Sequence, residues 1–232
     1  MPFISFVIPV CNEEETIENS VRTIKKFLDK SGYSYEIIIA NDGSTDKTTE
    51  IASRLALSCN KVRHLYSKKR LGKGGGIKNA FAKSKGRILI FEDVDLSAGV
   101  SYILDFIKEI KGGADICIGS RLLPNSKTKR TIMRKIFSLC YNLLIRILFD
   151  TRITDFQCGL KAFRRKCLST IMETKDNGFF FDTELMLRSE KKGLKIVQIP
   201  ITWEEKRKAK LNIVKTSIQM LYNLIKLRIL GV

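Results

Sequence analysis

Several kinds of residue that mark well-known active sites are rare or scattered in this sequence. Its 232 residues include one histidine, His64, and six cysteines without CxxC spacing. His64 falls in a predicted strand with no catalytic partner near it in sequence, so we expect a structural histidine. Isolated cysteines are typical of reduced, mostly buried thiols, which excludes a zinc site or a disulfide framework as the basis of the fold.

The sequence also lacks a membrane-spanning segment and a cleavable signal. No uninterrupted apolar run reaches the ~20 residues that a spanning helix needs. The first residues enter a predicted strand at once, without the basic and apolar regions of a cleavable signal. The GxxxxGK[ST] spacing of a phosphate-binding P-loop is missing as well. We therefore expect a protein that works in the cytosol and binds no nucleotide through a P-loop.

Acidic residues are scarce, with 24 Asp and Glu against 42 Lys and Arg and a formal net charge of +18. This balance predicts attraction to polyanions, either nucleic acid or an anionic membrane surface, and charge alone does not choose between them. The length is ample for one hydrophobic core and no linker interrupts it, so we expect one continuous domain over residues 1–232.

Four of the 24 acids follow the ends of predicted strands. Residues 88–91 form a short apolar run without polar alternation, typical of a strand buried on both faces, and Asp93 and Asp95 follow directly. At the carboxyl end of a parallel sheet these carboxylates can hold Mg²⁺ or Mn²⁺, which then bridges diphosphate oxygens. The alternative is that they cap the next helix or lie in a solvated loop.

Acids also follow two earlier predicted strands, with Glu13 after residues 5–10 and Asp42 after residues 36–40. Helical patterns over residues 17–28 and 48–57 separate these segments, which makes a βαβ array and predicts an α/β fold with a mostly parallel, Rossmann-like sheet flanked by helices. All four acids then meet at one edge of the sheet. A third strand, 62–66, precedes a basic glycine-rich loop, 68–76, that is suited to close approach to a phosphate.

Taken together, these motifs resemble those of the family 2 glycosyltransferases of GT-A fold. The matching segments are VIPVCNEE at 7–14, NDGSTD at 41–46, LGKG at 71–74 and EDVD at 92–95. The resemblance implies an inverting transferase that uses a nucleotide-diphosphate sugar and Mg²⁺ or Mn²⁺. Carried over by position, Pro9, Glu13 and Asp42 would line the nucleoside, while Asp93, Val94 and Asp95 would meet the metal and the diphosphate.

The second half resembles the polyprenyl-phosphate glycosyltransferases, through IGSR at 118–121, ITDFQCGLKAF at 153–163, FDTEL at 181–185 and the segment 203–212. The nearest likeness is to dolichyl-phosphate β-glucosyltransferases, which implies UDP-glucose as donor and dolichyl phosphate as acceptor. Two departures from the mannosyl branch favour the glucosyl branch. Ser97 stands where the mannosyl branch carries glutamine, and segment 205–210 is highly charged. The alternatives are a dolichyl-phosphate mannosyltransferase using GDP-mannose and a family 2 transferase with a soluble glycan acceptor.

A lipid phosphate is already anionic near neutral pH, so its attack on a sugar requires cations rather than a general base. Arg121 follows a predicted strand, 114–119, and could hold the acceptor phosphate through two hydrogen bonds. Lys210 could close over the diphosphate, unless its segment is only a solvated run of charge. Asp155 could orient the arginine or act as a base, or else cap a helix or pair with a buried arginine. We thus expect Asp95, Arg121 and Asp155 to serve catalysis.

Two amphipathic helices are predicted in the second half, at 132–149 and 213–230, with basic residues among and beside their apolar stripes. Such helices can lie in a membrane interface, and the alternatives are packing on the core or in a homodimer. We expect a nucleotide-sugar-binding half, 1–120, and an acceptor-binding half, 121–232, working at the cytoplasmic face of a membrane, the endoplasmic reticulum in a eukaryote or the cell membrane otherwise. No nucleic-acid partner is expected, because a basic nucleic-acid-binding module explains neither the four acids nor the lack of aromatic and basic interleaving.

Overall fold

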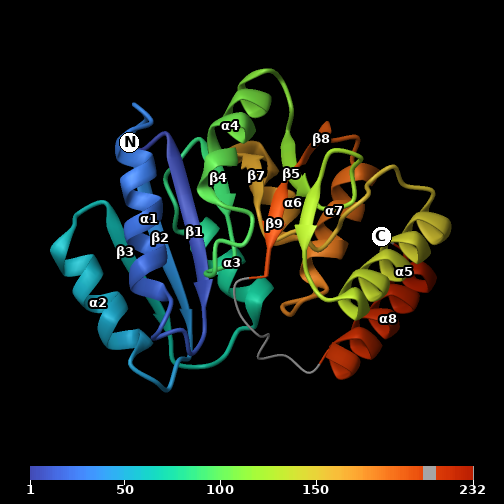
Figure 1. Ribbon diagram of the computed structural model, residues 1–232, viewed down its shortest axis with the longest axis horizontal. Helices are drawn as coiled ribbons and strands as arrows, with labels where there is room; N and C mark the ends of the chain where they lie inside the picture. The colour runs from blue at the N-terminus through green and yellow to red at the C-terminus, as the bar shows by residue number, and fades with distance from the viewer. Residues whose placement is uncertain (206–212, 232) are drawn as a thin grey trace.

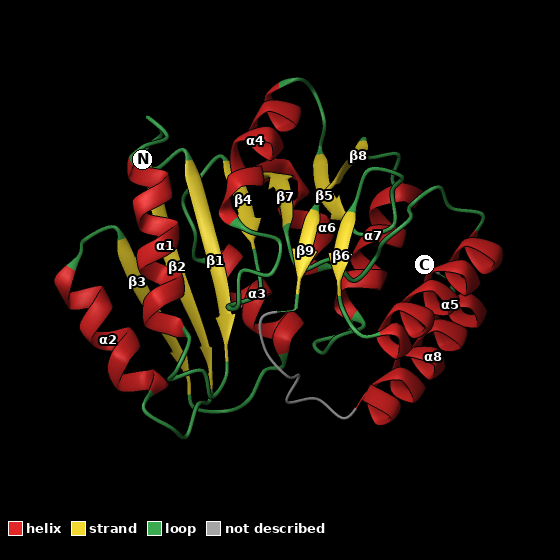
Figure 2. Cartoon of the chain, in the orientation of Figure 1, coloured by secondary structure: helices red, strands yellow, loops and turns green. Residues whose placement is uncertain are grey.

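The computed structural model describes residues 1–205 and 213–231 and is built on one seven-stranded sheet (Figures 1 and 2). The strand order is β3-β2-β1-β4-β7-β5-β8. Adjacent strands are parallel except at β7, which runs antiparallel to both β4 and β5. The strands are β1 (Ile4–Val10), β2 (Tyr35–Asp42), β3 (Val62–Ser67), β4 (Ile88–Phe91), β5 (Ile116–Ser120), β7 (Lys161–Arg164) and β8 (Ile196–Pro200). The α/β fold with a mostly parallel sheet is therefore confirmed.

Helices cover both faces of the sheet, and a separate pair of short parallel strands, β6 (Lys127–Lys129) and β9 (Thr202–Glu204), lies beside it. Apolar side chains of α1, α2 and α4 fill the core on one face, and those of α3, α6 and α7 fill it on the other. The α-helices are α1 (Ile17–Asp29), α2 (Thr48–Ser58), α3 (Lys73–Ala82), α4 (Ile103–Lys111), α5 (Ile132–Phe149), α6 (Leu168–Met172), α7 (Phe181–Lys191) and α8 (Ile213–Leu230).

The central strands are apolar throughout because side chains on both faces are buried. In β1, Phe6 and Ile8 belong to the core beneath α1 while Val7 belongs to the core beneath α3. Each such side chain contributes roughly 1.5–3 kcal/mol when fully buried. Phe91 pairs with Val7 in the register of β1 and β4, so the chain after β4 leaves the sheet beside the last residues of β1. The carboxyl ends of these strands thus meet at one edge, as predicted.

The glycine-rich segment differs from the prediction of a loop through residue 76. Helix α3 begins at Lys73, so its three glycines, Gly74 to Gly76, lie in the first turn of a helix. A Cβ atom at Gly74 would stand 2.5 Å from the Cβ of Phe181 in α7. Gly74 therefore lets α3 approach α7 closely, a tertiary contact that local sequence does not show.

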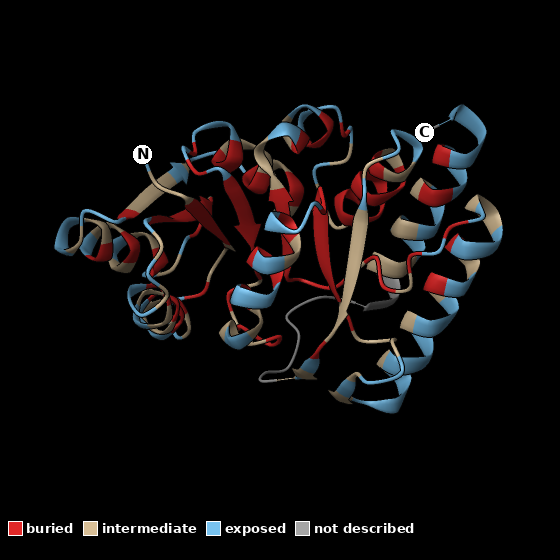
Figure 3. Ribbon diagram, turned by 90° about the horizontal axis from the view of Figure 1, so that it is seen from above, coloured by how far each residue is buried: buried red, intermediate tan, exposed pale blue. Residues whose placement is uncertain are grey.

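Helices α5 and α8 lie side by side at one end of the molecule, with the bounds predicted from their apolar periodicity (Figures 1 and 3). Their inner faces bury Ile145 and Leu224, but many of their large apolar side chains are exposed, which excludes packing on this chain's own core as the whole reason for the stripes. No helix in the described ranges, 1–205 and 213–231, is both long and apolar enough to cross a membrane.

Candidate functional site

Asp93 stands at the centre of the carboxyl edge, two residues beyond β4. Its side chain is 44% exposed, and its Oδ1 lies 2.9 Å from Nζ of Lys73 at the start of α3. Val94 next to it is buried and its carbonyl accepts a hydrogen bond from the Ser20 hydroxyl. Asp95 Oδ1 accepts a hydrogen bond from the Ser97 backbone N–H at 3.1 Å. The Asp-x-Asp segment is therefore fixed by backbone contacts while its carboxylates stay at the surface of the site.

Behind Asp93 lies a group of buried charges. Lys73 Nζ is 3.3 Å from Oδ2 of Asp182 in α7, and Asp182 also forms an ion pair with Lys161 of β7. Both lysine ammonium groups lie over the ring of Phe91, at 5.9 and 5.4 Å from its centre. Burial lowers the pKa of Lys73, but Asp182 and Asp93 outweigh it and leave that pKa above its ordinary value. Partial burial raises the pKa of Asp93, but Lys73 outweighs it and holds that pKa below its ordinary value, so both groups are ionised at neutral pH.

Gly159 leaves the space that the Asp93 carboxylate occupies. A Cβ atom at Gly159 would stand 2.3 Å from Oδ2 of Asp93, closer than any side chain tolerates. Gly159→Ala is expected to push Asp93 aside and reduce turnover by about a hundredfold, the usual cost of misplacing a reacting group by about 1 Å. Gly76→Ala is the control, because a Cβ atom there meets nothing within 4 Å. Initial rates of both variants test this, and wild-type turnover in Gly159→Ala would contradict it.

Arg121 and Asp155 form a buried ion pair next to this group. The Arg121 side chain donates from Nε and Nη2 to the two carboxylate oxygens at 2.7 and 2.8 Å, and its backbone N–H donates at 3.0 Å. Burial raises the pKa of Asp155, but Arg121 outweighs it and holds that pKa below its ordinary value. The guanidinium also faces the ring of Trp203. Of the alternatives for Asp155, the structure shows pairing with a buried arginine. The edge of the Arg121 guanidinium that carries Nε and Nη2 is occupied by Asp155 and does not face a ligand.

The residues predicted to line a nucleoside lie along β1 and β2. Pro9 pairs with Ala40 in the strand register, and the backbone N–H of Glu13, a buried residue, donates to the Thr48 hydroxyl at 2.7 Å. Asp42 accepts from the backbone N–H groups of Leu71 and of Gly72, the latter at 2.9 Å. Since Lys73 follows Gly72, Asp42 is connected to Asp93 through this loop and the first turn of α3.

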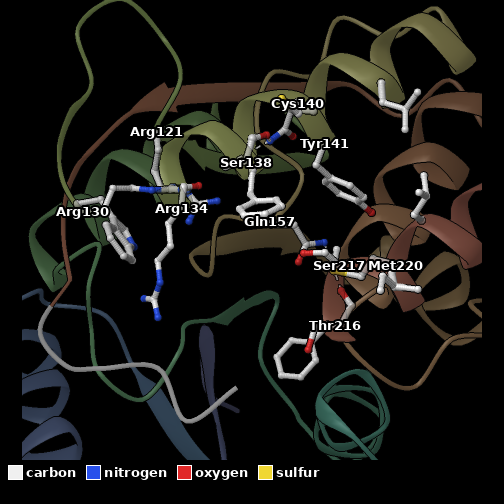
Figure 4. Close-up of a pocket in the computed structure, with 17 residues that line it drawn as sticks. Arg121, Arg130, Arg134, Ser138, Cys140, Tyr141, Gln157, Thr216, Ser217 and Met220 are labelled. Atoms are coloured by element: carbon white, nitrogen blue, oxygen red, sulfur yellow. Dashed lines mark hydrogen bonds between the residues drawn. The ribbon is translucent and has the colours of Figure 1, made fainter. Parts of the chain in front are cut away.

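A pocket of about 570 Å³ opens between α5 and α8, adjoining Arg121 (Figure 4). Arg121, Arg130 and Arg134 gather at one end of it, and Thr216, Ser217 and Met220 lie across from them. Apolar and aromatic side chains form most of the remaining wall, namely Phe137, Leu144, Phe179, Trp203, Ile218 and Leu221. Such a pocket accepts a ligand that is anionic at one end and apolar along the rest.

Arg130 is the least compensated of the three arginines. Its Nε is buried and makes no hydrogen bond within the part of the chain that the structure describes. Burial, and the nearby charge of Arg121, lower the pKa of Arg130 to about 10, so it remains charged at neutral pH. Arg134, by contrast, forms an ion pair with Glu205. The Nη2 of Arg130 donates to the Arg134 carbonyl, so Nε is the buried guanidinium nitrogen left without an acceptor among the described residues, and such a buried donor indicates the place of an anionic ligand.

Sequence reasoning missed several of these residues. Lys73 stood inside the glycine-rich motif, and Lys161 and Asp182 stood inside quoted motifs without a role. The available signal for Lys161 was its position between the apolar residues Leu160 and Ala162, since a buried charge requires a partner. Lys210, which we predicted to close the site, lies outside the described residues.

The residues at the edge fit a divalent cation shared with a substrate. Mg²⁺ and Mn²⁺ prefer oxygen ligands, and Mg²⁺ is usually held by one or two carboxylates together with substrate phosphates. Asp93 and Asp95 supply two carboxylates, one residue apart in the sequence. In the described ranges no three His, Cys, Asp or Glu side chains gather into a complete cage. The donor set thus suits a cation completed by a diphosphate.

Comparisons with known proteins agree with this geometry. Residues 5–172 match the model of the family described as glycosyl transferase family 2. The chain is 35% identical over 94% of its length to glycosyltransferase AglD of Haloferax volcanii, of which it spans only 35%. It is 30% identical over 97% of its length to the dolichyl-phosphate beta-glucosyltransferase of Saccharomyces cerevisiae, of which it spans 74%.

Solved structures resemble the fold as a whole. Glucosyl-3-phosphoglycerate synthase of Mycobacterium tuberculosis, crystallised with uridine diphosphate, aligns with a TM-score of 0.75 at 21% identity, over 98% of this chain and 80% of that one. The same enzyme crystallised with Mn²⁺, uridine diphosphate and phosphoglyceric acid also aligns with a TM-score of 0.75, at 20% identity, over 98% and 78%. At this identity the likeness shows a common GT-A fold.

Proposed function

Since this chain belongs to glycosyl transferase family 2 and is a glycosyltransferase, we propose that it transfers a hexose, glucose from UDP-glucose, to the phosphate of a polyprenyl lipid such as dolichyl phosphate. The lipid phosphate oxygen attacks the anomeric carbon from the face opposite the leaving group. The bond between that carbon and the diphosphate oxygen breaks, and its electron pair leaves with UDP. The product is an inverted sugar phosphodiester.

On the donor side, Pro9, Glu13 and Asp42 would line the nucleoside, and Asp93, Val94 and Asp95 would meet the diphosphate. Asp93 and Asp95 would hold Mg²⁺ or Mn²⁺, which supplies positive charge to the leaving diphosphate when bound. Support comes from the carboxylates at the strand edge and from a structural neighbour that was crystallised with Mn²⁺ and UDP-glucose. Residues 1–120 would form the donor half and residues 121–232 the acceptor half.

The observation that carries the acceptor assignment is the pocket between α5 and α8, with three arginines at one end and apolar walls. Arg130 offers an unsatisfied buried Nε, and Arg121, braced by Asp155, retains one guanidinium edge for a phosphate. Because a lipid phosphate is already ionised, these cations suffice and no base is required. The relatives named as dolichyl-phosphate beta-glucosyltransferases support the same acceptor class.

The two helices that form the pocket also present the surface for a membrane. Large apolar side chains exposed on α5 and α8 include Ile132, Met133, Ile136, Leu143, Ile147, Ile218, Ile225 and Ile229. The net charge of +18 favours an anionic lipid surface. We propose that these faces enter the membrane interface, so that the lipid tail leaves the pocket into the bilayer while its phosphate stays at the arginines. The expected place is the cytoplasmic face of the membrane.

The donor and the class of reaction are tested by transfer of radiolabel into organic-extractable lipid. Purified protein is incubated with polyprenyl phosphate in vesicles, Mn²⁺ or Mg²⁺, and either UDP-glucose or GDP-mannose carrying label. We expect label in the lipid from UDP-glucose, abolished by a chelator. Label from GDP-mannose alone would show that the donor is GDP-mannose and not UDP-glucose. No label in the lipid from either donor would contradict the proposal.

A further inference from the structure

Four buried or half-buried charges of alternating sign form a chain that ends at Asp93. Lys161 comes from β7, Asp182 from α7, Lys73 from α3, and Asp93 follows β4. Their order in space is Lys161, Asp182, Lys73, Asp93. Four elements that are distant in sequence thus place side chains of opposite charge next to one another.

The chain runs from the interior to the surface of the site. The side chains of Lys161 and Asp182 are 0% and 1% exposed, that of Lys73 is 14% exposed and that of Asp93 is 44% exposed. Lys161 is closed at its inner end by the Phe156 carbonyl, to which it donates at 3.0 Å. Lys73 is shared between Asp93 at 2.9 Å and Asp182 at 3.3 Å. Asp93 is the member that a ligand can reach.

The electrostatic consequence concerns a cation at Asp93. The positive charge of Lys73 opposes such a cation, and the negative charge of Asp182 offsets Lys73. Without a charge on Asp182, Lys73 would have Asp93 as its remaining carboxylate partner among the residues that the structure describes. We propose that Asp182 is a positioning residue that sets the affinity of Asp93 for its divalent cation by sharing Lys73. This inference rests on the proposed metal site at Asp93 and Asp95.

The test is calorimetric titration of Mn²⁺ into the full-length protein with saturating UDP. Asp182→Asn combined with Lys161→Met removes one buried pair without changing the net charge, and such replacements often preserve folding. We expect this double variant to bind Mn²⁺ severalfold more weakly, because the loss of Asp182, which contacts Lys73, outweighs the loss of the positive charge of Lys161, which lies behind Asp182. We expect Lys73→Met to bind Mn²⁺ severalfold more tightly. Lys83→Met, which removes a charge from an exposed position just beyond α3, is the control and should leave the affinity unchanged.

The opposite signs separate this role from a structural one. General damage to the site would weaken Mn²⁺ binding in every variant, whereas the chain of charges requires Lys73→Met to strengthen it, and that single variant tests the inference even if the double variant does not fold. Weakened or unchanged affinity for Mn²⁺ in Lys73→Met, or wild-type affinity in a folded double variant, would overturn this inference and leave the proposed metal site standing. If the wild-type protein binds no Mn²⁺ with UDP present, the metal site and this inference both fail.

Discussion

Asp95→Asn is expected to reduce glycosyl transfer by about a thousandfold while leaving the melting temperature within a few degrees of the wild type. Asparagine keeps the shape of the side chain and can still accept from the Ser97 backbone N–H, so the local turn survives. It lacks the charge that a hard divalent cation requires. Losing several kcal/mol of charge stabilisation in the transition state corresponds to a rate loss of this order.

The matched control is Asp105→Asn, the same chemical change at an exposed position in the first turn of α4. It should leave the rate of transfer unaffected. The comparison is made by initial rates at increasing Mn²⁺, together with thermal unfolding of each variant. Near-normal activity of Asp95→Asn at saturating Mn²⁺ would remove Asp95 from the proposed role.

Asp155→Asn is expected to lower the free energy of unfolding by about 3 kcal/mol or more, because it leaves the buried Arg121 guanidinium without its counter-charge. In a chain of this length that corresponds to a fall in melting temperature of roughly 6–12 °C. Since its folded-state pKa is below the ordinary value, Asp155 contributes its full stabilisation above the unfolded pKa of about 4. That contribution is lost as the pH falls through the lower, folded-state pKa, so the penalty is fully present at pH 7.

Two further variants separate the stability of this pair from its function. Glu173→Gln breaks an exposed ion pair with Lys192 and should cost less than about 1 kcal/mol. Asp155→Leu with Arg121→Met replaces the buried pair by apolar side chains and should recover much of the stability without recovering transfer. Chemical denaturation and initial rates measure both quantities. A double variant that transfers sugar normally would contradict the role of Arg121 at the acceptor phosphate.

The parts of the fold that follow local rules were predictable from sequence. Strand β4 was marked by an unbroken apolar run, because burial on two faces leaves that pattern, and α5 was marked by apolar residues at helical spacing. Placement of Asp42 and Asp93 at one edge followed from the parallel arrangement of their strands. These inferences need only short segments and the rule that parallel strands share an edge.

What sequence could not predict depends on contacts between distant segments. Lys73 meets Asp93 and Asp182, and neither partner is near it in the chain. The first turn of α3 packs against Phe181 at Gly74, a contact that no pattern within residues 68–76 reveals. Whether the stripe of α5 is covered or exposed also depends on the helices that pack beside it.

We propose that the acceptor is a phosphate on a polyprenyl lipid rather than on a small soluble molecule. The measurement is the rate of glucose transfer from UDP-glucose, with Mn²⁺ present, to polyprenyl phosphate in vesicles and to 3-phosphoglycerate in a parallel reaction. The apolar wall of the pocket predicts transfer to the lipid at least about a hundredfold more efficient, since several buried isoprenyl groups add to the affinity. Equal or better transfer to 3-phosphoglycerate would contradict the account.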